Sequence, residues 1–280
     1  PHLSQLPVVL TNMAEPVPED AESGSAFTFH ALDNTFKSLS AREAQDSLHK
    51  WNLSPFMRAH TFRFDQRFDP EQLDAFLSDF FGDANVQLAM PVCTAPGDAV
   101  HGASWAPLGP VQQAAVRHTP LRTTVLRLDF FDRLNDAGVV RNGSITGCYD
   151  AQCGDVIVSD VLRKLLLDES AEEWDLFSAA ERSELIFHVM QRLAIGGGMN
   201  QWDTEMEPYL ALTKALYKDL VTVQKTAGGK LQIASLATSV TGISGCSLFP
   251  RESPHNFCYV SIDPIARQVK CWYAAFFSIM

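Results

Sequence analysis

The sequence predicts an α+β fold, a single compact domain with a mixed or antiparallel sheet, on three observations. The 280 residues are 46% hydrophobic and 20% charged, the profile of a chain that buries a sizeable core. Helical periodicity dominates the middle of the chain, whereas the C-terminal quarter contains paired strand-like runs joined by turn residues. This segregation favours α+β, and an early alternation of strand and helix leaves α/β as the less favoured alternative.

The domain boundaries follow from composition. Residues 1–25 combine Pro7, Pro16 and Pro18 with the acidic cluster "PEDAE", which predicts a flexible acidic N-terminal segment. We therefore expect the globular α+β domain at residues 26–280. Within it, the glycines and prolines of residues 91–120 predict a long loop.

The N-terminal elements are indicated by caps and periodicity. Ser40 and Glu43 form a capping-box pattern that predicts a helix start, and "AHTFRFDQRF" alternates as a half-buried strand does. Asp69 and Pro70 predict the start of a further helix that ends before Gly82. Its apolar positions form one stripe, which predicts a core face at Leu73, Phe76, Leu77, Phe80 and Phe81.

The remaining elements follow the same logic. We expect a strand at "LRTTVLRL", a short helix ending at Gly138, and a tight turn at Asn142-Gly143. Helices are predicted to start at Ser159 and at the Ser178–Glu181 capping box, and the glycines of "AIGGG" suit a helix end; a third helix is "EPYLALTKALYKDL". Two C-terminal hairpins are predicted, one around Gly228-Gly229 and one around Asp263-Pro264.

Charge and apolar runs exclude several classes of partner. The 33 acidic and 22 basic side chains give a net charge of -11, which disfavours nucleic acid. The apolar run "WYAAFF" is far shorter than the ~20 residues of a membrane span, so no membrane partner is expected. No secretory leader is evident, and six dispersed cysteines indicate reduced thiols in the cytoplasm.

The stretch "GCYDAQCGD" raises the question of a metal site. Two buried structural thiols are the favoured interpretation, because four intervening residues suit neither a redox pair nor common zinc spacing. The alternative is a metal-dependent enzyme or a zinc-stabilised protein using Cys148, Cys153, Cys246 and His255. No catalytic constellation or cofactor motif is found, and His188 is interpreted as a core or rim histidine.

Several stretches together resemble the cilia- and flagella-associated protein 300 family. They span roughly residues 28–270 and include "TFKSLSAREAQDSLHKWNL", "FRFDQRFDPEQLDAFLSDFFGDANV", "FFDRLNDAGVVR", "CYDAQC", "SDVLRKLLL", "PYLALTKALYKDLV" and "VSIDPIARQVK". The resemblance rests on the number and order of these stretches. It implies a non-catalytic factor, in the cytoplasm and in the cilium or flagellum (axoneme), that assembles and delivers outer and inner dynein arms.

The resemblance also implies the class of partner: axonemal dynein chains, co-chaperone-type dynein assembly factors and the intraflagellar transport machinery. A factor of this kind needs an exposed apolar or aromatic surface. The candidate partner-binding residues are Trp105, Phe276, Phe277, Ile279 and Met280. The alternative for the C-terminal residues is a final strand packed on the sheet.

Overall fold

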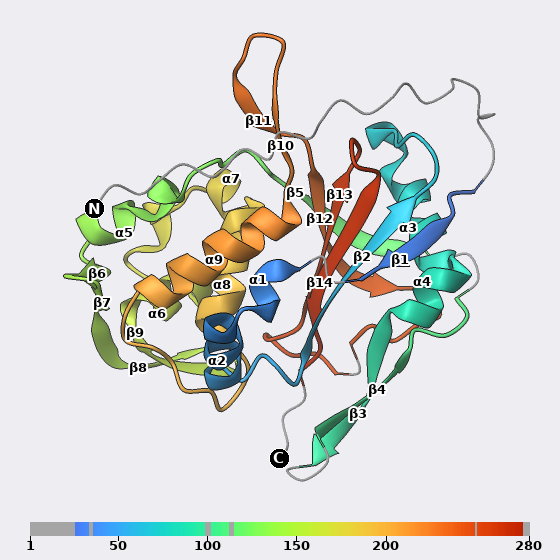
Figure 1. The fold of residues 1–280 in the computed structure, drawn as a ribbon. Helices are drawn as coiled ribbons and strands as arrows, with labels where there is room; N and C mark the ends of the chain where they lie inside the picture. The colour runs from blue at the N-terminus through green and yellow to red at the C-terminus, as the bar shows by residue number, and fades with distance from the viewer. Residues whose placement is uncertain (1–25, 34–35, 99–101, 112–114, 250, 277–280) are drawn as a thin grey trace.

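A six-stranded antiparallel sheet runs through the centre of the computed structural model (Figure 1). The structure describes residues 26–33, 36–98, 102–111, 115–249 and 251–276, and the predicted N-terminal segment 1–25 lies outside them. In spatial order, the strands are β1 (Phe29–Leu32), β2 (Met57–Phe64), β14 (Gln268–Ala274), β13 (Phe257–Asp263), β12 (Leu236–Ile243) and β5 (Val116–Leu121). This sheet, with helices segregated from most of its strands, confirms the α+β prediction.

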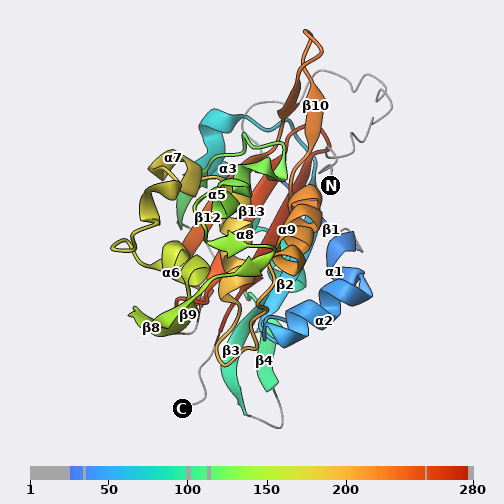
Figure 2. The same cartoon turned by 90° about the vertical axis from the view of Figure 1, so that its left-hand side faces the viewer.

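Helices cover both faces of the sheet (Figures 1 and 2). One face carries α1 (Lys37–Ser40), α2 (Arg42–Lys50), α6 (Val161–Leu167), α8 (Leu185–Ile195) and α9 (Glu207–Leu220), and the other carries α3 (Leu73–Gly82) and α4 (Ala84–Ala89). The shorter helices are α5 (Arg133–Asp136), α7 (Ala179–Arg182), η1 (Pro70–Gln72), η2 (Leu128–Phe131) and η3 (Trp174–Leu176). Within the described residues, no helix is both long and apolar enough to cross a membrane.

The central strands bury side chains on both faces of the sheet. Tyr259 and Trp272 pack in the core beneath α8 and α9, whereas their neighbours Val260 and Cys271 pack in the core beneath α3. All seven residues of β13 are buried as a result. The C-terminal strands therefore read as nearly continuous apolar runs rather than as a clean alternation.

The predicted core face of α3 is confirmed. Phe76, Leu77, Phe80 and Phe81 are all buried, and Leu73 packs against the same core. Ring centroids of neighbouring phenylalanines lie 4.7–5.5 Å from that of Phe76 in edge-on geometry. The aromatic stripe is thus a packing element and not a cofactor box.

Three predicted hairpins are also confirmed. Asn142 (φ 52°) and Gly143 (φ 88°) make the left-handed turn between β6 (Val140–Arg141) and β7 (Ser144–Ile145). Gly228 and Gly229 lie between β10 (Val223–Lys225) and β11 (Leu231–Ile233), a ribbon that projects from the body of the protein (Figure 1). Asp263 Oδ1 accepts backbone hydrogen bonds from the turn that joins β13 to β14.

The prediction of a long loop over residues 91–120 is wrong for most of that segment. It contains β3 (Pro91–Asp98), β4 (Gly102–Pro107) and most of β5. The β3–β4 pairing shifts register twice, and irregular positions of this kind accommodate glycine and proline within a two-stranded ribbon. Conversely, the strand predicted at "LRTTVLRL" is wrong, since β5 has already ended at Leu121.

Helix starts were predicted with mixed success. The Ser178–Glu181 capping box and the glycine end of α8 at Gly196 are confirmed. The Ser40 cap is wrong, because α2 begins at Arg42 and no side chain caps it. The Ser159 cap is wrong by one residue, because the side chain of Asp160 accepts a hydrogen bond from the backbone N–H of Arg163 at 2.8 Å and caps α6. The two-stranded ribbon of β8 (Gly147–Cys153) and β9 (Val156–Asp160) precedes this helix.

Candidate partner-binding site

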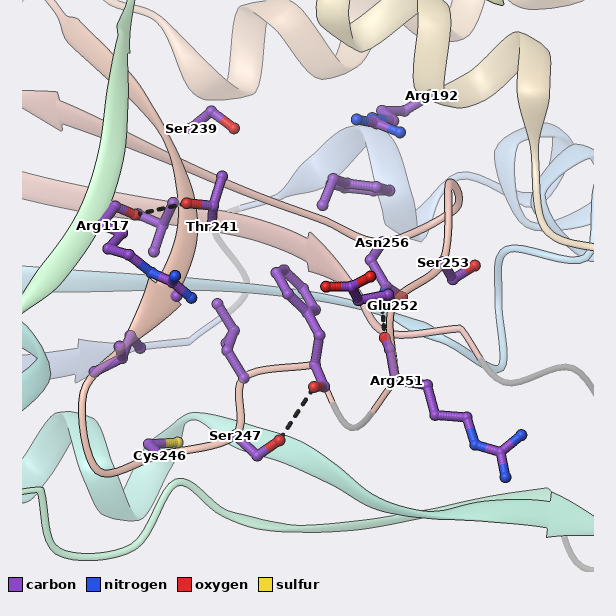
Figure 3. A pocket seen from close by; sticks show the side chains of 16 residues that line it. Arg117, Arg192, Ser239, Thr241, Cys246, Ser247, Arg251, Glu252, Ser253 and Asn256 are labelled. Atoms are coloured by element: carbon purple, nitrogen blue, oxygen red, sulfur yellow. Dashed lines mark hydrogen bonds between the residues drawn. The ribbon is translucent and has the colours of Figure 1, made fainter. Parts of the chain in front are cut away.

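A cavity of about 460 Å³ opens at the end of β12, beside the edge strand β5 (Figure 3). Its walls come from β12, from the loop between β12 and β13, and from single residues of β5, α8 and β13. The described lining residues are Arg117, Arg192, Ser239, Val240, Thr241, Gly242, Ile243, Cys246, Ser247, Leu248, Phe249, Arg251, Glu252, Ser253, Asn256 and Phe257. We call this cavity the arginine pocket.

A bulge in β12 shapes the floor of the arginine pocket. The pairing of β12 with β5 shifts register between Val240 and Gly242. Beyond the bulge, the Ser244 backbone N–H donates to Ala115 O at 2.9 Å, and Gly245 turns the chain with a φ of 76°. The loop between β12 and β13 therefore turns away from the sheet at Gly245 and lines the side of the pocket that faces β12.

Arg117 reaches into the pocket from β5, across the glycine of the bulge (Figure 3). A Cβ at Gly242 would lie 2.6 Å from Arg117 Nη2, so only glycine leaves the guanidinium its place. Thr241 Oγ1 donates to Arg117 O at 3.3 Å and holds the strand beneath it. Among the described residues, no carboxylate pairs with this guanidinium.

Arg192 enters from α8 on the other side of the pocket (Figure 3). Its Nε donates to Tyr259 Oη at 2.9 Å and its Nη1 to Pro254 O at 2.7 Å. Both acceptors are neutral, so within the described part of the chain the charge is hydrogen-bonded but not neutralised. Burial and, next, the positive charge of Arg192 lower the pKa of His188 to about 4.

The other polar groups of the pocket suit binding better than bond making. Arg251 points outward, away from Arg117 and Arg192, and Glu252 is the one acidic side chain among the described lining residues (Figure 3). Burial raises the pKa of the Cys246 thiol, which keeps it protonated and poorly nucleophilic. Among the described lining residues there is no histidine, the usual partner that activates a cysteine thiol.

The two cysteines of "GCYDAQCGD" lie on β8. Cys153 is buried with Val156 and Val158, and Cys148 is half-buried. Burial is the first cause that raises the pKa of both thiols. Both are free cysteines in the structure, which fits the structural-thiol interpretation.

The structure does not bring the four residues of the metal alternative together. Cys246 packs beside the core beneath α3, whereas Cys153 belongs to the separate cluster on β8 and β9. His255 Nδ1 donates to Gly196 O at 2.8 Å, and burial lowers its pKa. The described residues include no group of three or more His, Cys, Asp and Glu side chains able to hold a metal ion.

Trp105 lies on β4 rather than in a loop. Its ring is partly buried, with the Arg58 guanidinium carbon 4.1 Å from the ring centroid and Tyr273 beside it. Its Nε1–H is buried without a hydrogen-bond partner. Trp105 therefore contributes mainly to packing, and a docking role for it stays a prediction.

Phe276 is buried, but it lies two residues beyond the end of β14 and so is not part of the final strand that the alternative expected. Its ring centroid lies 4.8 Å from those of Phe56 and His255, and its backbone N–H donates to Asn256 Oδ1 at 2.8 Å. Phe277, Ile279 and Met280 lie outside the described residues, so their docking role also stays a prediction.

Sequence reasoning missed Arg117 and Arg192 because neither belongs to a motif. One indication was present: Gly242 interrupts an otherwise strand-like run, and an isolated glycine in a strand marks a bulge or a close approach. Which side chain approaches that glycine depends on the pairing of β5 with β12, which spans more than 100 residues of sequence.

Comparison with known proteins identifies the family. The family model for cilia- and flagella-associated protein 300 matches residues 26–274. A protein of that name from Chlamydomonas reinhardtii is 36% identical over 261 residues, covering 90% of this chain and 98% of the relative. One from Paramecium tetraurelia is 29% identical over 248 residues, covering 88% and 92%. No solved structure matches this chain.

The fold is of the α+β class, and the matched family and relatives define the chain as one associated with cilia and flagella. The chain belongs to the cilia- and flagella-associated protein 300 family. The resemblance stated from the sequence stretches is therefore confirmed.

Proposed function

We propose that this protein is a non-catalytic adaptor for the assembly and transport of axonemal outer and inner dynein arms, and that it acts through protein–protein contacts. The observation that carries the proposal is the family match, which covers nearly all of the described chain. The proposed partners are axonemal dynein chains, co-chaperone-type assembly factors and the intraflagellar transport machinery.

The geometry of the described residues is compatible with this role. The arginine pocket offers two cations with no described carboxylate partner, and its thiol is kept protonated. Such a site supplies electrostatic complementarity to a partner, which contributes specificity and a faster encounter. The proposed places of action are the cytoplasm, where arms are assembled, and the cilium or flagellum, where they are delivered.

The test removes the protein from a ciliated cell and measures dynein heavy chains in isolated axonemes by mass spectrometry. We expect both outer-arm and inner-arm heavy chains to fall together, and re-expression of the full chain to restore them. Proximity labelling from the tagged protein should mark dynein chains and assembly factors above a cytoplasmic control. Axonemes with normal content of both arms in the null cell would refute the proposal.

A further inference from the structure

The charge of the arginine pocket is opposite to that of the chain. The whole protein carries a net charge of -11, yet two arginines, Arg117 and Arg192, reach into the pocket against the single glutamate Glu252, while the third lining arginine, Arg251, points outward. At physiological ionic strength, charges are screened over about 8 Å, so a ligand inside the pocket responds to the pocket and little to the distant acidic surface. An anion that reaches the pocket is therefore attracted locally.

The position of Arg117 is built into the fold. The bulge at Val240 and Gly242 and the missing side chain at Gly242 leave room for the guanidinium above β12. Arg117 is exposed to solvent, and among the described residues it forms no ion pair, although Glu252 lines the same pocket. Its donors are available to a ligand, and a guanidinium can bind a carboxylate or a phosphate through two hydrogen bonds.

Arg192 supplies a second, less mobile charge. It is half-buried, and hydrogen bonds to Tyr259 and Pro254 fix two of its nitrogens. After burial, its charge is a cause of the lowered pKa of His188, and it also lowers that of His255.

Hydroxyl groups complete the set of donors. Ser253 Oγ accepts a hydrogen bond from the His255 backbone N–H at 3.3 Å, which leaves its own hydrogen for a ligand. Ser239 lies on β12 between the two arginines (Figure 3). Cationic and neutral donors around one cavity are the arrangement that acidic and phosphorylated motifs require.

We propose that the arginine pocket binds an acidic side chain, a carboxylate or a phosphate monoester, of an extended segment of a partner polypeptide. A polypeptide is the favoured source because Arg117 lies on β5, one of the two edge strands of the sheet, and none of the six residues of β5 is buried. An extended segment beside this edge can place one side chain in the cavity while its backbone lies along the strand. The inference deepens the proposed adaptor function and rests on it for the identity of the partner.

The test measures binding of fluorescein-labelled hexaglutamate to the purified full chain by fluorescence polarisation, with labelled hexaglutamine as the uncharged control. Arg117→Gln removes one cation of the pocket. Gly242→Ala changes no charge, but its Cβ requires the flexible Arg117 guanidinium to shift. Arg42→Gln is the matched control, because that side chain is 90% exposed on α2 and the charge change is the same as in Arg117→Gln.

We expect hexaglutamate to bind the wild type and hexaglutamine not to bind. Arg117→Gln should weaken hexaglutamate binding about tenfold, as expected for the loss of a charge-assisted contact. Gly242→Ala, which shifts the guanidinium without removing it, should weaken binding less, and Arg42→Gln should stay within about twofold. Circular dichroism and thermal unfolding verify that each variant is folded. Equal affinities for wild type and Arg117→Gln would overturn the proposal.

Two further measurements distinguish a polypeptide anion from free phosphate, and the pocket inference from the adaptor proposal. If inorganic phosphate binds in the pocket but hexaglutamate does not, the pocket takes a free small anion and the polypeptide proposal fails. If wild type and both pocket variants capture dynein chains equally from ciliated-cell extract, the adaptor function stands and the pocket inference fails. If the wild type captures no dynein chain, the adaptor function fails, and the peptide measurement alone decides whether the pocket binds acidic side chains.

Discussion

The buried ion pair between Asp160 and Arg163 allows a quantitative test of the fold. The Arg163 side chain is 1% exposed, and its Nη1 lies 2.7 Å from Asp160 Oδ2. The same arginine donates to Ala194 O on α8 at 2.7 Å and to Tyr209 Oη on α9 at 2.5 Å. One side chain therefore ties α6 to the two long helices that cover the sheet.

Substituting Asp160→Ala removes two interactions at once. The guanidinium stays buried with only neutral acceptors, which costs about 3–5 kcal/mol when one member of a buried pair is lost. The cap of α6 at the Arg163 backbone N–H is lost as well, at about 1 kcal/mol. Against a typical stability of about 5–15 kcal/mol, a loss of roughly 4–6 kcal/mol is a large fraction of the total.

Urea unfolding followed by circular dichroism measures the loss, and three further variants separate its parts. Asp160→Asn keeps a capping oxygen but not the charge, so it should recover about 1 kcal/mol relative to Asp160→Ala. Arg163→Met removes the cation, and the double variant Asp160→Ala, Arg163→Met should be less unstable than the sum of the single variants. If Asp160→Ala unfolds within ~1 kcal/mol of the wild type, the reasoning about the buried charge is refuted.

Three other predictions concern pH, the C-terminus and metal. The pKa of His188 is about 4 in the folded protein and 6.5 in the unfolded chain, so the free energy of unfolding should fall as the pH drops from 6.5 toward 4, by up to about 3 kcal/mol from this group. His188→Gln should flatten the plot of unfolding free energy against pH. An unchanged slope in this variant would contradict the lowered pKa of His188. Deleting residues 277–280 should weaken capture of dynein chains with at most ~0.5 kcal/mol of lost stability, whereas Phe276→Ala should cost about 3–5 kcal/mol in urea unfolding; undiminished capture would exclude the tail as a docking segment. Elemental analysis of the purified chain should find substoichiometric zinc and iron, and one tightly held ion per chain would revive the Cys and His alternative.

Local rules predicted the elements whose causes are local. The Asn142-Gly143 turn, the Ser178–Glu181 capping box and the stripe of α3 each depend on residues within a few positions of one another. Their chemistry is the same in a peptide as in the folded chain, so sequence alone is sufficient. The family resemblance was also predictable, since it depends on the order of stretches and not on their contacts.

The failures arose where long-range pairing overrides composition. Residues 91–98 contain proline and glycine, yet β4 pairs with them and two bulges absorb the irregular positions. The capping pattern at Ser40 was outweighed as well, because that residue ends α1 instead of starting α2. Tertiary contacts decide such cases, and no window of a few residues contains them.

The arginine pocket shows how the same limit applies to function. Arg117 and Gly242 are separated by more than 120 residues, and each alone is unremarkable in sequence. Only the antiparallel pairing of β5 with β12 sets the guanidinium above the glycine, and only the return of α8 brings Arg192 to the opposite wall. A site of this kind consists of long-range contacts and has no sequence motif, so it is recognised only once the pairing of the strands is known. A variant that shifts the guanidinium without removing its charge, beside one that removes the charge, tests whether its position matters.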